Sequence, residues 1–253
     1  MTNPMDLTDK HILVVGASSG IGKETAVLLS KLGAKVSLLA RNEGKLIETQ
    51  SLLGGTGHDI FTQDLKDIDA IENLIEQIAK KQGVFDGIVY SAGVTQRRTL
   101  SMLKYNHLHE LMQVNFYAFI ELMRCVTKKK NRGVPFSAVV ISSTASMVGD
   151  KGKIAYSASK GAINSVVRCM AKELADKEVR VNAILPSWIK TEMFDDAADT
   201  IMEFEDTKQV LAKQYLGIGE SRDVANMVGF LLSDAAKFIT GTTIAVDGGR
   251  LSS

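Results

Sequence analysis

Cysteine, proline, aromatic side chains and net charge are all scarce in this chain of 253 residues. Its 30 Lys and Arg nearly balance its 29 Asp and Glu, and the net charge of +1 provides no attraction to nucleic acid or to a membrane surface. No apolar run reaches the roughly 20 residues of a membrane helix. Residues 1–10 are polar and unlike a secretory signal. We therefore expect a cytoplasmic protein with neither nucleic-acid nor membrane partners.

The few cysteines and histidines argue against two further classes. Cys125 and Cys169 have no partner motif and fall in helical stretches, so we expect buried thiols in a reducing compartment, with a disulfide as the alternative. His107 and His109 are two positions apart and would point to different helix faces. None of the four histidines has metal-ligand spacing, so we expect no metal site.

Aliphatic residues, in contrast, are plentiful and alternate between short apolar runs and amphipathic stretches. Hydrophobic residues make up 45% of the chain and aromatic residues only 6%. The apolar runs predict strands at about 11–15, 35–40, 59–63, 85–90, 137–141, 179–185 and 242–246. Helical periodicity predicts helices at about 23–32, 42–53, 67–81, 106–130, 154–176 and 221–232, with Ser221 as a candidate N-cap.

This alternation, without a Pro-rich linker or an internal repeat, predicts one α/β domain over residues 1–253. The expected architecture is a doubly wound Rossmann fold, a seven-stranded parallel sheet with helices on both faces. Residues 191–219 contain no predicted strand and are long for a plain connection, so we expect a substrate loop or lid there.

A glycine turn follows the first predicted strand. Gly16, Gly20 and Gly22 lie between that strand and a helix, which is the context of a phosphate-binding turn. Glycine lets the backbone approach a pyrophosphate, and the helix N-terminus offers free N–H groups. A tight structural turn is the alternative.

The end of the second strand bears on cofactor choice. An NAD-binding unit is expected to place Asp or Glu there to bind the ribose 2′-hydroxyl. Here Arg41 and Asn42 follow the strand, with no carboxylate before Glu43. A guanidinium suits a 2′-phosphate, so this end favours NADP(H), unless Arg41 is only a solvated surface residue.

The stretch with the most chemistry surrounds the fifth strand and the helix after it. Ser142 and Ser143 come at the strand's carboxyl end, where open α/β sheets bind ligands. Tyr156 and Lys160 are four apart and share one helix face. An ammonium group there would lower the pKa of the phenol and make an acid/base pair. The alternatives are turn-forming serines and a structural surface pair.

Asn115 stands inside a long predicted helix, where Asn is unfavourable. A polar role for its side chain, a locally opened backbone, or simple surface exposure would each account for it.

Taken in order, these residues resemble the single-domain branch of the short-chain dehydrogenase/reductase family, with most likeness to 3-oxoacyl-acyl-carrier-protein reductases. The resemblance extends from about His11 to Gly249. Its motifs are Gly16/Gly20/Gly22, Asp64, Ala92-Gly93, Asn115, Ser143, Tyr156-x3-Lys160, Arg180-Val181-Asn182, Pro186, Thr191 and Asp247-Gly248-Gly249.

The resemblance implies a role for each matching residue. The implied catalytic residues are Asn115, Ser143, Tyr156 and Lys160. The implied cofactor-binding residues are Gly16, Ser18, Ser19, Gly20, Ile21, Gly22, Arg41, Asn42, Asp64, Leu65, Ser91, Ala92, Gly93, Tyr156, Lys160, Pro186, Ile189 and Thr191.

In that assignment Tyr156 is the general acid or base, and Ser143 binds the substrate oxygen. Lys160 binds the nicotinamide ribose, and Asn115 anchors a water chain to it. The implied substrate is a small carbonyl compound or acyl thioester, and the implied assembly is a homotetramer.

Three residues depart from the family pattern. Val15, Ser91 and Ser187 stand where relatives usually have Thr, Asn and Gly. The first two changes predict a repacked junction beside the adenosine, with Ser91 supplying a hydroxyl. Ser187 adds a Cβ near the nicotinamide.

Substrate and assembly rest on weaker patterns. Met147, Val148, Met193 and Phe194 suggest an apolar pocket wall, with plain core residues as the alternative. The predicted helices 106–130 and 154–176 contain more apolar residues than packing against one face of the sheet requires, which favours an oligomer. The alternative is that all of these residues belong to the intramolecular core. They are Phe116, Phe119, Met123, Val166, Val167 and Met170. An alcohol or sugar-alcohol oxidoreductase and a nucleotide-binding regulator without turnover remain alternative functions.

Overall fold

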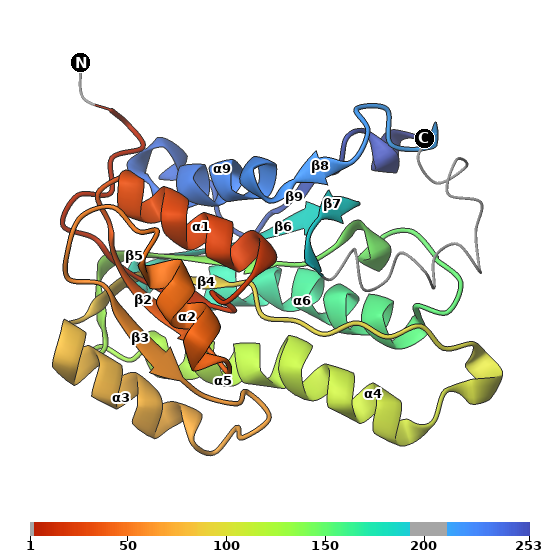
Figure 1. Ribbon diagram of the computed structural model, residues 1–253, viewed down its shortest axis with the longest axis horizontal. Coiled ribbons are helices and arrows are strands. Elements are labelled where there is room, and N and C mark those ends of the chain that lie inside the picture. The colour runs from red at the N-terminus through yellow and green to blue at the C-terminus, as the bar shows by residue number, and fades with distance from the viewer. Residues whose placement is uncertain (1–2, 193–211) are drawn as a thin grey trace.

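A computed structural model describes residues 3–192 and 212–253. Its main sheet has seven strands in the order β3-β2-β1-β4-β5-β6-β9, and every neighbouring pair is parallel (Figure 1). The strands are β1 (His11–Val15), β2 (Lys35–Ala40), β3 (Asp59–Thr62), β4 (Phe85–Tyr90), β5 (Arg132–Ile141), β6 (Val179–Pro186) and β9 (Thr243–Val246). The predicted doubly wound sheet is therefore confirmed.

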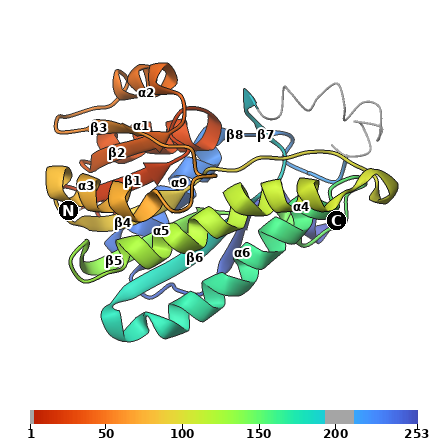
Figure 2. The ribbon, with the colours of Figure 1, turned by 90° about the horizontal axis from the view of Figure 1, so that it is seen from below.

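Helices cover both faces of this sheet (Figures 1 and 2). One layer contains α1 (Gly20–Lys31), α2 (Glu43–Gln50) and α9 (Ser221–Leu232). The other contains α3 (Ile71–Gln82), α4 (Tyr105–Met112), α5 (Ala118–Val126) and α6 (Ile154–Glu173).

Strand β1 illustrates why the sheet is buried on both sides. Leu13 and Val15 face the core beneath α3, α5 and α6, whereas Ile12 and Val14 face the core beneath α1 and α9. All four are at most 2% exposed. A strand covered on both faces needs a continuous apolar run rather than alternation, which is the pattern that predicted it.

The predicted helix over residues 106–130 is interrupted. Helix α4 is followed by a π-helical turn over Gln113–Tyr117, and α5 continues from Ala118. Asn115 lies inside that turn and is fully buried, so its surface-exposure alternative is wrong. A second difference concerns α9, where Glu220 rather than Ser221 is the N-cap residue and exchanges capping hydrogen bonds with Asp223.

Beyond the main sheet, β7 (Ile189–Lys190) and β8 (Gly219–Glu220) form a small parallel pair that the sequence did not predict. They bring the two described ends of the predicted lid together beside the carboxyl ends of the strands (Figure 1). Most of that lid, together with Met193 and Phe194, lies outside the described residues.

Other packing predictions are met only in part. Phe119, Met123 and Val167 are buried within the chain's own core, so they cannot contribute to an oligomer interface. Cys125 is buried, but Cys169 is exposed, and both are free thiols. In the described ranges, no helix combines the length and apolarity needed to cross a membrane.

Glu72, Glu121 and Cys125 bring their ligand-type atoms within 4.8 Å of one another. Arg124 pairs with both carboxylates at 2.5 and 2.6 Å, and Lys128 also pairs with Glu72. Burial, reinforced by Glu121, raises the pKa of the Cys125 thiol to about 12, which keeps it protonated. The cluster is therefore neutralised by its own cations rather than arranged as a metal site.

Candidate active site

The glycine turn between β1 and α1 packs too tightly for side chains. Gly16 has a φ of +84°, and a Cβ there would lie 2.6 Å from the Ala92 backbone nitrogen. A Cβ on Gly22 would lie 2.1 Å from the Gly16 carbonyl oxygen. Ser19, the N-cap residue of α1, makes no side-chain capping bond. The turn thus presents free N–H groups of a helix N-terminus at the carboxyl edge of the sheet.

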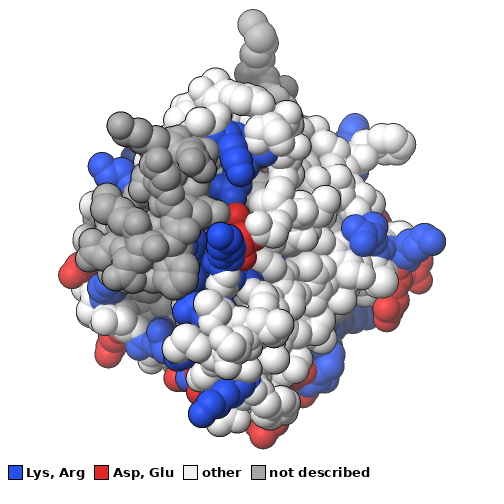
Figure 3. Space-filling view, turned by 90° about the vertical axis from the view of Figure 1, so that its right-hand side faces the viewer, with Lys and Arg blue, Asp and Glu red and all other residues white. Residues whose placement is uncertain are grey.

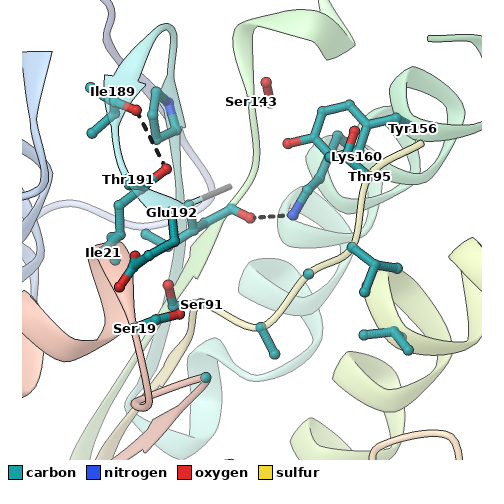
Figure 4. A pocket seen from close by; sticks show the side chains of 18 of the residues that line it. Ser19, Ile21, Ser91, Thr95, Ser143, Tyr156, Lys160, Ile189, Thr191 and Glu192 are labelled. Atoms are coloured by element: carbon teal, nitrogen blue, oxygen red, sulfur yellow. Dashed lines mark hydrogen bonds between the residues drawn. The ribbon is translucent and has the colours of Figure 1, made fainter. Parts of the chain in front are cut away.

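A cavity of about 520 Å³ begins at this turn and follows the carboxyl ends of the strands. In Figure 4 Ser19, Ile21, Ser91 and Thr191 lie on one side, and Ser143, Tyr156, Lys160 and Thr95 lie on the other. Its volume falls within the range typical of small-molecule and cofactor sites. The position at this edge is also where open α/β sheets bind their ligands.

One end of the cavity is lined by residues from the ends of β2 and β3. Arg41 is exposed and lies beside Asn42 and Lys45, while Asp64 and Leu65 line the wall after β3. Asn42 Oδ1 accepts a hydrogen bond of 3.0 Å from the Lys45 backbone N–H, which caps α2. This end therefore presents two cations, of which the sequence had indicated only Arg41.

The junction next to the glycine turn is held by the backbone. Ser91 N donates to Val15 O at 2.9 Å, and Val15 is fully buried. Because this bond needs no side-chain hydroxyl, the Val15 and Ser91 departures leave the turn against Ala92 intact. Ser91 lines the cavity.

Tyr156 and Ser143 lie on the same side of the cavity (Figure 4). Ser143 follows β5 in extended conformation, and Tyr156 belongs to the first turn of α6. Burial raises the pKa of Tyr156, and the nearby Ser143 hydroxyl lowers it to a smaller extent. The predicted lowering of the Tyr156 pKa by Lys160 is therefore not seen, because desolvation dominates.

Lys160 lies one turn further along α6. Its Nζ is 5.8 Å from the centre of the Tyr156 ring and donates to the Ile141 carbonyl oxygen at 2.8 Å. Burial lowers the pKa of Lys160 to about 8. An ammonium carries three donors, so this one bond leaves the group able to donate to further acceptors in the cavity.

Asn115 lies behind the cavity wall rather than in it. Its side chain accepts from Val94 N at 2.8 Å, donates to Val94 O at 3.0 Å and donates to Ser159 Oγ at 2.9 Å. Ser159 Oγ in turn donates to the Tyr156 carbonyl oxygen at 2.8 Å. Asn115 thus ties the loop after β4 to the first turn of α6, where Tyr156 lies.

A second buried network, which the sequence did not indicate, supports Ser143. Ser142 Oγ donates to Asn164 Oδ1 at 2.7 Å, and Asn164 Nδ2 donates to Ser146 Oγ at 2.7 Å. Ser146 Oγ donates to the Ser143 carbonyl oxygen at 2.5 Å. Nothing in the local pattern separates Asn164 from an ordinary polar helix residue, because its partners are distant in the chain.

The cavity brings together most of the predicted site residues. Gly22 and Asn115 stand behind the lining, while the other predicted positions line it. Met147 and Val148 do not line it, and Met147 is 64% exposed, so this part of the predicted apolar wall is wrong. Lining residues that the sequence did not indicate include Lys45, Thr95, Asp150, Lys153, Trp188, Glu192 and Arg250.

The residues present fit a dinucleotide. The glycine cradle, which a Cβ would fill, suits a pyrophosphate beside the α1 N-terminus. At the other end Ser187 Oγ lies buried in the cavity wall, and within residues 3–192 and 212–253 it has no hydrogen-bond partner. A buried hydroxyl needs such a partner, which a nicotinamide carboxamide would supply.

Comparison with known sequences gives matches over nearly the whole chain. The sequence model of a family described as enoyl-(acyl carrier protein) reductase matches residues 16–250. An L-xylulose reductase of Caenorhabditis elegans is 33% identical over 246 residues, which is 96% of each chain. A 3-oxoacyl-(acyl-carrier-protein) reductase of Thermotoga maritima is 31% identical over 249 residues, covering 97% of this chain and 99% of the relative.

Solved structures agree in architecture. A structure from Agrobacterium tumefaciens with bound NADP has a TM-score of 0.88 and 28% sequence identity, with 100% of both chains covered. Thermoplasma acidophilum aldohexose dehydrogenase has a TM-score of 0.87 and 27% identity, covering 99% of this chain and 97% of that one.

Proposed function

The chain belongs to the short-chain dehydrogenase/reductase family, and we propose that it transfers a hydride between NADP(H) and a ketone or secondary alcohol. The observation that carries this proposal is that the Ser143 and Tyr156 hydroxyl groups line the same cavity that starts at the glycine turn, with Lys160 beside them. Two hydroxyl groups on one side of a cavity suit a carbonyl oxygen that gains negative charge during reduction.

Each site residue has a defined part in this reaction. Ser143 donates to the substrate oxygen and orients it. Tyr156 donates its phenolic proton to that oxygen as charge develops. Lys160 binds the nicotinamide ribose and contributes positive charge beside the phenol. The bound nicotinamide supplies the hydride itself.

The state of Tyr156 favours the reductive direction near neutral pH. Because burial raises the pKa of Tyr156 above its ordinary value of 10, the phenol is protonated and can act as an acid. Oxidation of an alcohol needs the phenolate instead. We therefore expect the rate of oxidation to rise with pH through the alkaline range, as the phenolate fraction grows. A pH profile of alcohol oxidation that is flat between pH 7 and 10 would contradict this assignment.

NADP(H) is the proposed cofactor because two cations, Arg41 and Lys45, line the end of the cavity after β2. A 2′-phosphate placed there would be charge-paired, and Ser18 and Ser19 of the glycine turn line the same cavity as neutral donors. The structure from Agrobacterium tumefaciens that contains NADP gives this choice a precedent.

Small carbonyl compounds, including 3-oxoacyl thioesters, form the proposed substrate class. The named relatives include both a 3-oxoacyl reductase and an L-xylulose reductase, so a sugar or sugar-alcohol substrate is the second candidate. A cytoplasmic homotetramer is also part of the proposal.

The experiment is a screen of NADPH oxidation against acetoacetyl thioesters, ketoses, steroids and quinones. We expect turnover with at least one ketone. If NADPH binds but no carbonyl compound is reduced and no alcohol is oxidised, the nucleotide-binding regulator becomes the better account.

A further inference from the structure

A second lysine, Lys153, lies beside Tyr156 and has no role in the mechanism above. It directly precedes α6 and lines the cavity. Its Nζ lies 5.3 Å from the centre of the Tyr156 ring and donates to Thr95 Oγ1 at 2.7 Å. Lys153 and Lys160 therefore place two ammonium groups around one tyrosine ring, and only Lys160 is needed for the ribose.

A neighbouring carboxylate, Asp150, acts on Lys153 only at a distance. The nearby carboxylate of Asp150 is held by Arg250 at 2.7 Å, and both partners of that ion pair are largely buried. In the part of the chain that the structure describes, Lys153 itself forms no ion pair. Burial lowers the pKa of Lys153 to about 8, and the positive charge of Arg97 adds to this effect.

The first turn of α6 adds to the positive potential at this point. Lys153 occupies the N-cap position, where Ser, Thr, Asp or Asn is usual, and the first turn contains no acidic residue. A lysine at the positive end of the helix dipole is unfavourable for folding. A residue that opposes local preference and also partly buries a charge is more often found at functional sites.

The surrounding surface is consistent with an anionic ligand. Figure 3 looks onto the side where the carboxyl ends of the strands open, and Lys and Arg side chains gather near the middle of this face. A small group of Asp and Glu atoms lies next to them (Figure 3). The cavity lining contains five Lys and Arg side chains and three Asp and Glu side chains. This excess of positive charge raises the local concentration of an anionic substrate.

We propose that Lys153 and Thr95 form the anion-binding end of the substrate site, so that the substrate is a small oxo acid or hydroxy acid with a free carboxylate. The Thr95 hydroxyl accepts from Lys153, so its own proton remains available for the ligand. One ammonium and one hydroxyl match the single charge of a carboxylate better than a phosphate dianion. This inference rests on the ketone-reductase function proposed above and specifies its substrate.

The test compares substrates that share a ketone and differ only in charge. With NADPH, kcat/KM is measured for acetoacetate against methyl acetoacetate and for pyruvate against methyl pyruvate. In at least one pair we expect the acid to be preferred about tenfold or more, which corresponds to about 1.4 kcal/mol, because only the acid can form a charge-assisted hydrogen bond with Lys153. Lys153→Met should remove this preference through a higher KM for the acid, leave the ester within about twofold, and leave NADPH binding unchanged.

Two further variants separate charge from local structure. Lys153→Arg should retain part of the acid preference, because it keeps the charge. Lys151→Met, two residues away and exposed, should behave as the wild type. Equal losses on acid and ester in Lys153→Met would identify a merely structural lysine and overturn the proposal.

Other outcomes also decide the matter. Equal kcat/KM of the wild type for each ester and its acid would contradict the anion site and leave the reductase function intact. Reduction of another ketone, without reduction of any of these acids or esters, would do the same. A preference for dihydroxyacetone phosphate over dihydroxyacetone without any acid preference would replace the carboxylate by a phosphate. No turnover of any carbonyl compound by a protein that binds NADPH would instead contradict the proposed function.

Discussion

At the scale of single residues, the buried charge of Lys160 is a cost to stability that function explains. Its ammonium donates a hydrogen bond to the Ile141 carbonyl oxygen, and burial lowers its pKa to about 8 from 10.5. A folded pKa below the unfolded one means that the stability associated with this group is present above pH 10.5 and lost as pH falls through 8.

Lys160→Met provides the corresponding prediction. Between pH 8 and 10.5 the free energy of unfolding of the wild type should rise by roughly 3 kcal/mol relative to Lys160→Met, because each pKa unit corresponds to about 1.4 kcal/mol. Chemical denaturation of both cofactor-free proteins at several pH values measures this difference. A difference in stability that does not change with pH would show that Lys160 is not buried as a charged group.

Arg41 carries the prediction on cofactor choice. We expect wild-type kcat/KM to favour NADPH over NADH by at least about tenfold, since a charge-assisted hydrogen bond of roughly 1.5–3 kcal/mol corresponds to about ten- to a hundredfold. Exposure of Arg41 makes the effect sensitive to salt. Arg41→Asp should shrink or reverse the preference.

Steady-state kinetics with both cofactors provides the measurement for Arg41, with Arg168→Asp on the exposed face of α6 as the control for a change of charge alone. Equal use of the two cofactors by the wild type would make Arg41 an ordinary surface residue. So would an unchanged preference in Arg41→Asp.

Site residues were predictable from the sequence where their role depends on residues close to them in the chain. Tyr156 and Lys160 share a helix face by spacing alone, and Gly16 and Gly22 follow directly from the strand–turn–helix pattern. Asn164, Lys153 and Thr95 were not predictable, because their partners lie far away in the sequence. The direction of the Tyr156 pKa shift also depends on burial, which spacing does not reveal.

At the scale of secondary-structure elements, the π-helical turn between α4 and α5 links three parts of the site. It positions Asn115 to bond the Val94 backbone and Ser159 together. The sequence marked Asn115 as unfavourable in a helix and offered a locally opened backbone as one explanation, which the π-helical turn confirms. Helical periodicity on both sides gave no bounds for the interruption. The segment was therefore predicted as one continuous helix.

Asn115→Ala is expected to lower both stability and turnover. It leaves the part-buried backbone N–H and C=O groups of Val94 without their Asn115 partners, and an unsatisfied buried group costs about 1–3 kcal/mol. We expect a loss of at least about 2 kcal/mol in the free energy of unfolding, and a fall in kcat because the first turn of α6 is no longer tied to the loop after β4.

Asn131→Ala is the matched control for this variant. Asn131 is also buried and donates to the Cys125 carbonyl oxygen at 2.9 Å, but it lies outside the cavity lining. Its replacement should lower stability and leave kcat unchanged. Equal effects of the two substitutions on kcat would mean that Asn115 acts only through general stability.

At the scale of the whole molecule, the parallel sheet was predictable because each strand is a short apolar run between glycine, proline or polar residues. The interface of an oligomer was not predictable in the same way, because three of the six residues that the sequence assigned to it are core residues. Exposed aromatic residues remain on the outer side of α4 and the π-helical turn, where Tyr105 is 74% and Tyr117 39% exposed. Their rings flank His109, with centroid distances of 5.8 and 6.1 Å.

We expect a homotetramer of about 110 kDa, four times the 27.4 kDa of one chain. Sedimentation at micromolar concentration measures it. Tyr117→Glu should weaken assembly by placing a charge on this aromatic surface, whereas Ile47→Glu on the opposite layer, at α2, should not. A stable monomer of the wild-type protein would contradict the prediction.

Tyr156→Phe tests the central claim, that the chain is a carbonyl reductase whose proton donor is Tyr156. The substitution removes the phenolic hydroxyl and retains the ring between the two lysines. The measurement is single-turnover NADPH oxidation with the best ketone of the screen, alongside fluorescence titration of NADPH binding. We predict a rate at least about a hundredfold lower with cofactor affinity unchanged, in line with the 10²–10⁴-fold contribution of general acid catalysis. A rate above about a tenth of the wild-type value, with NADPH still bound, would contradict the account.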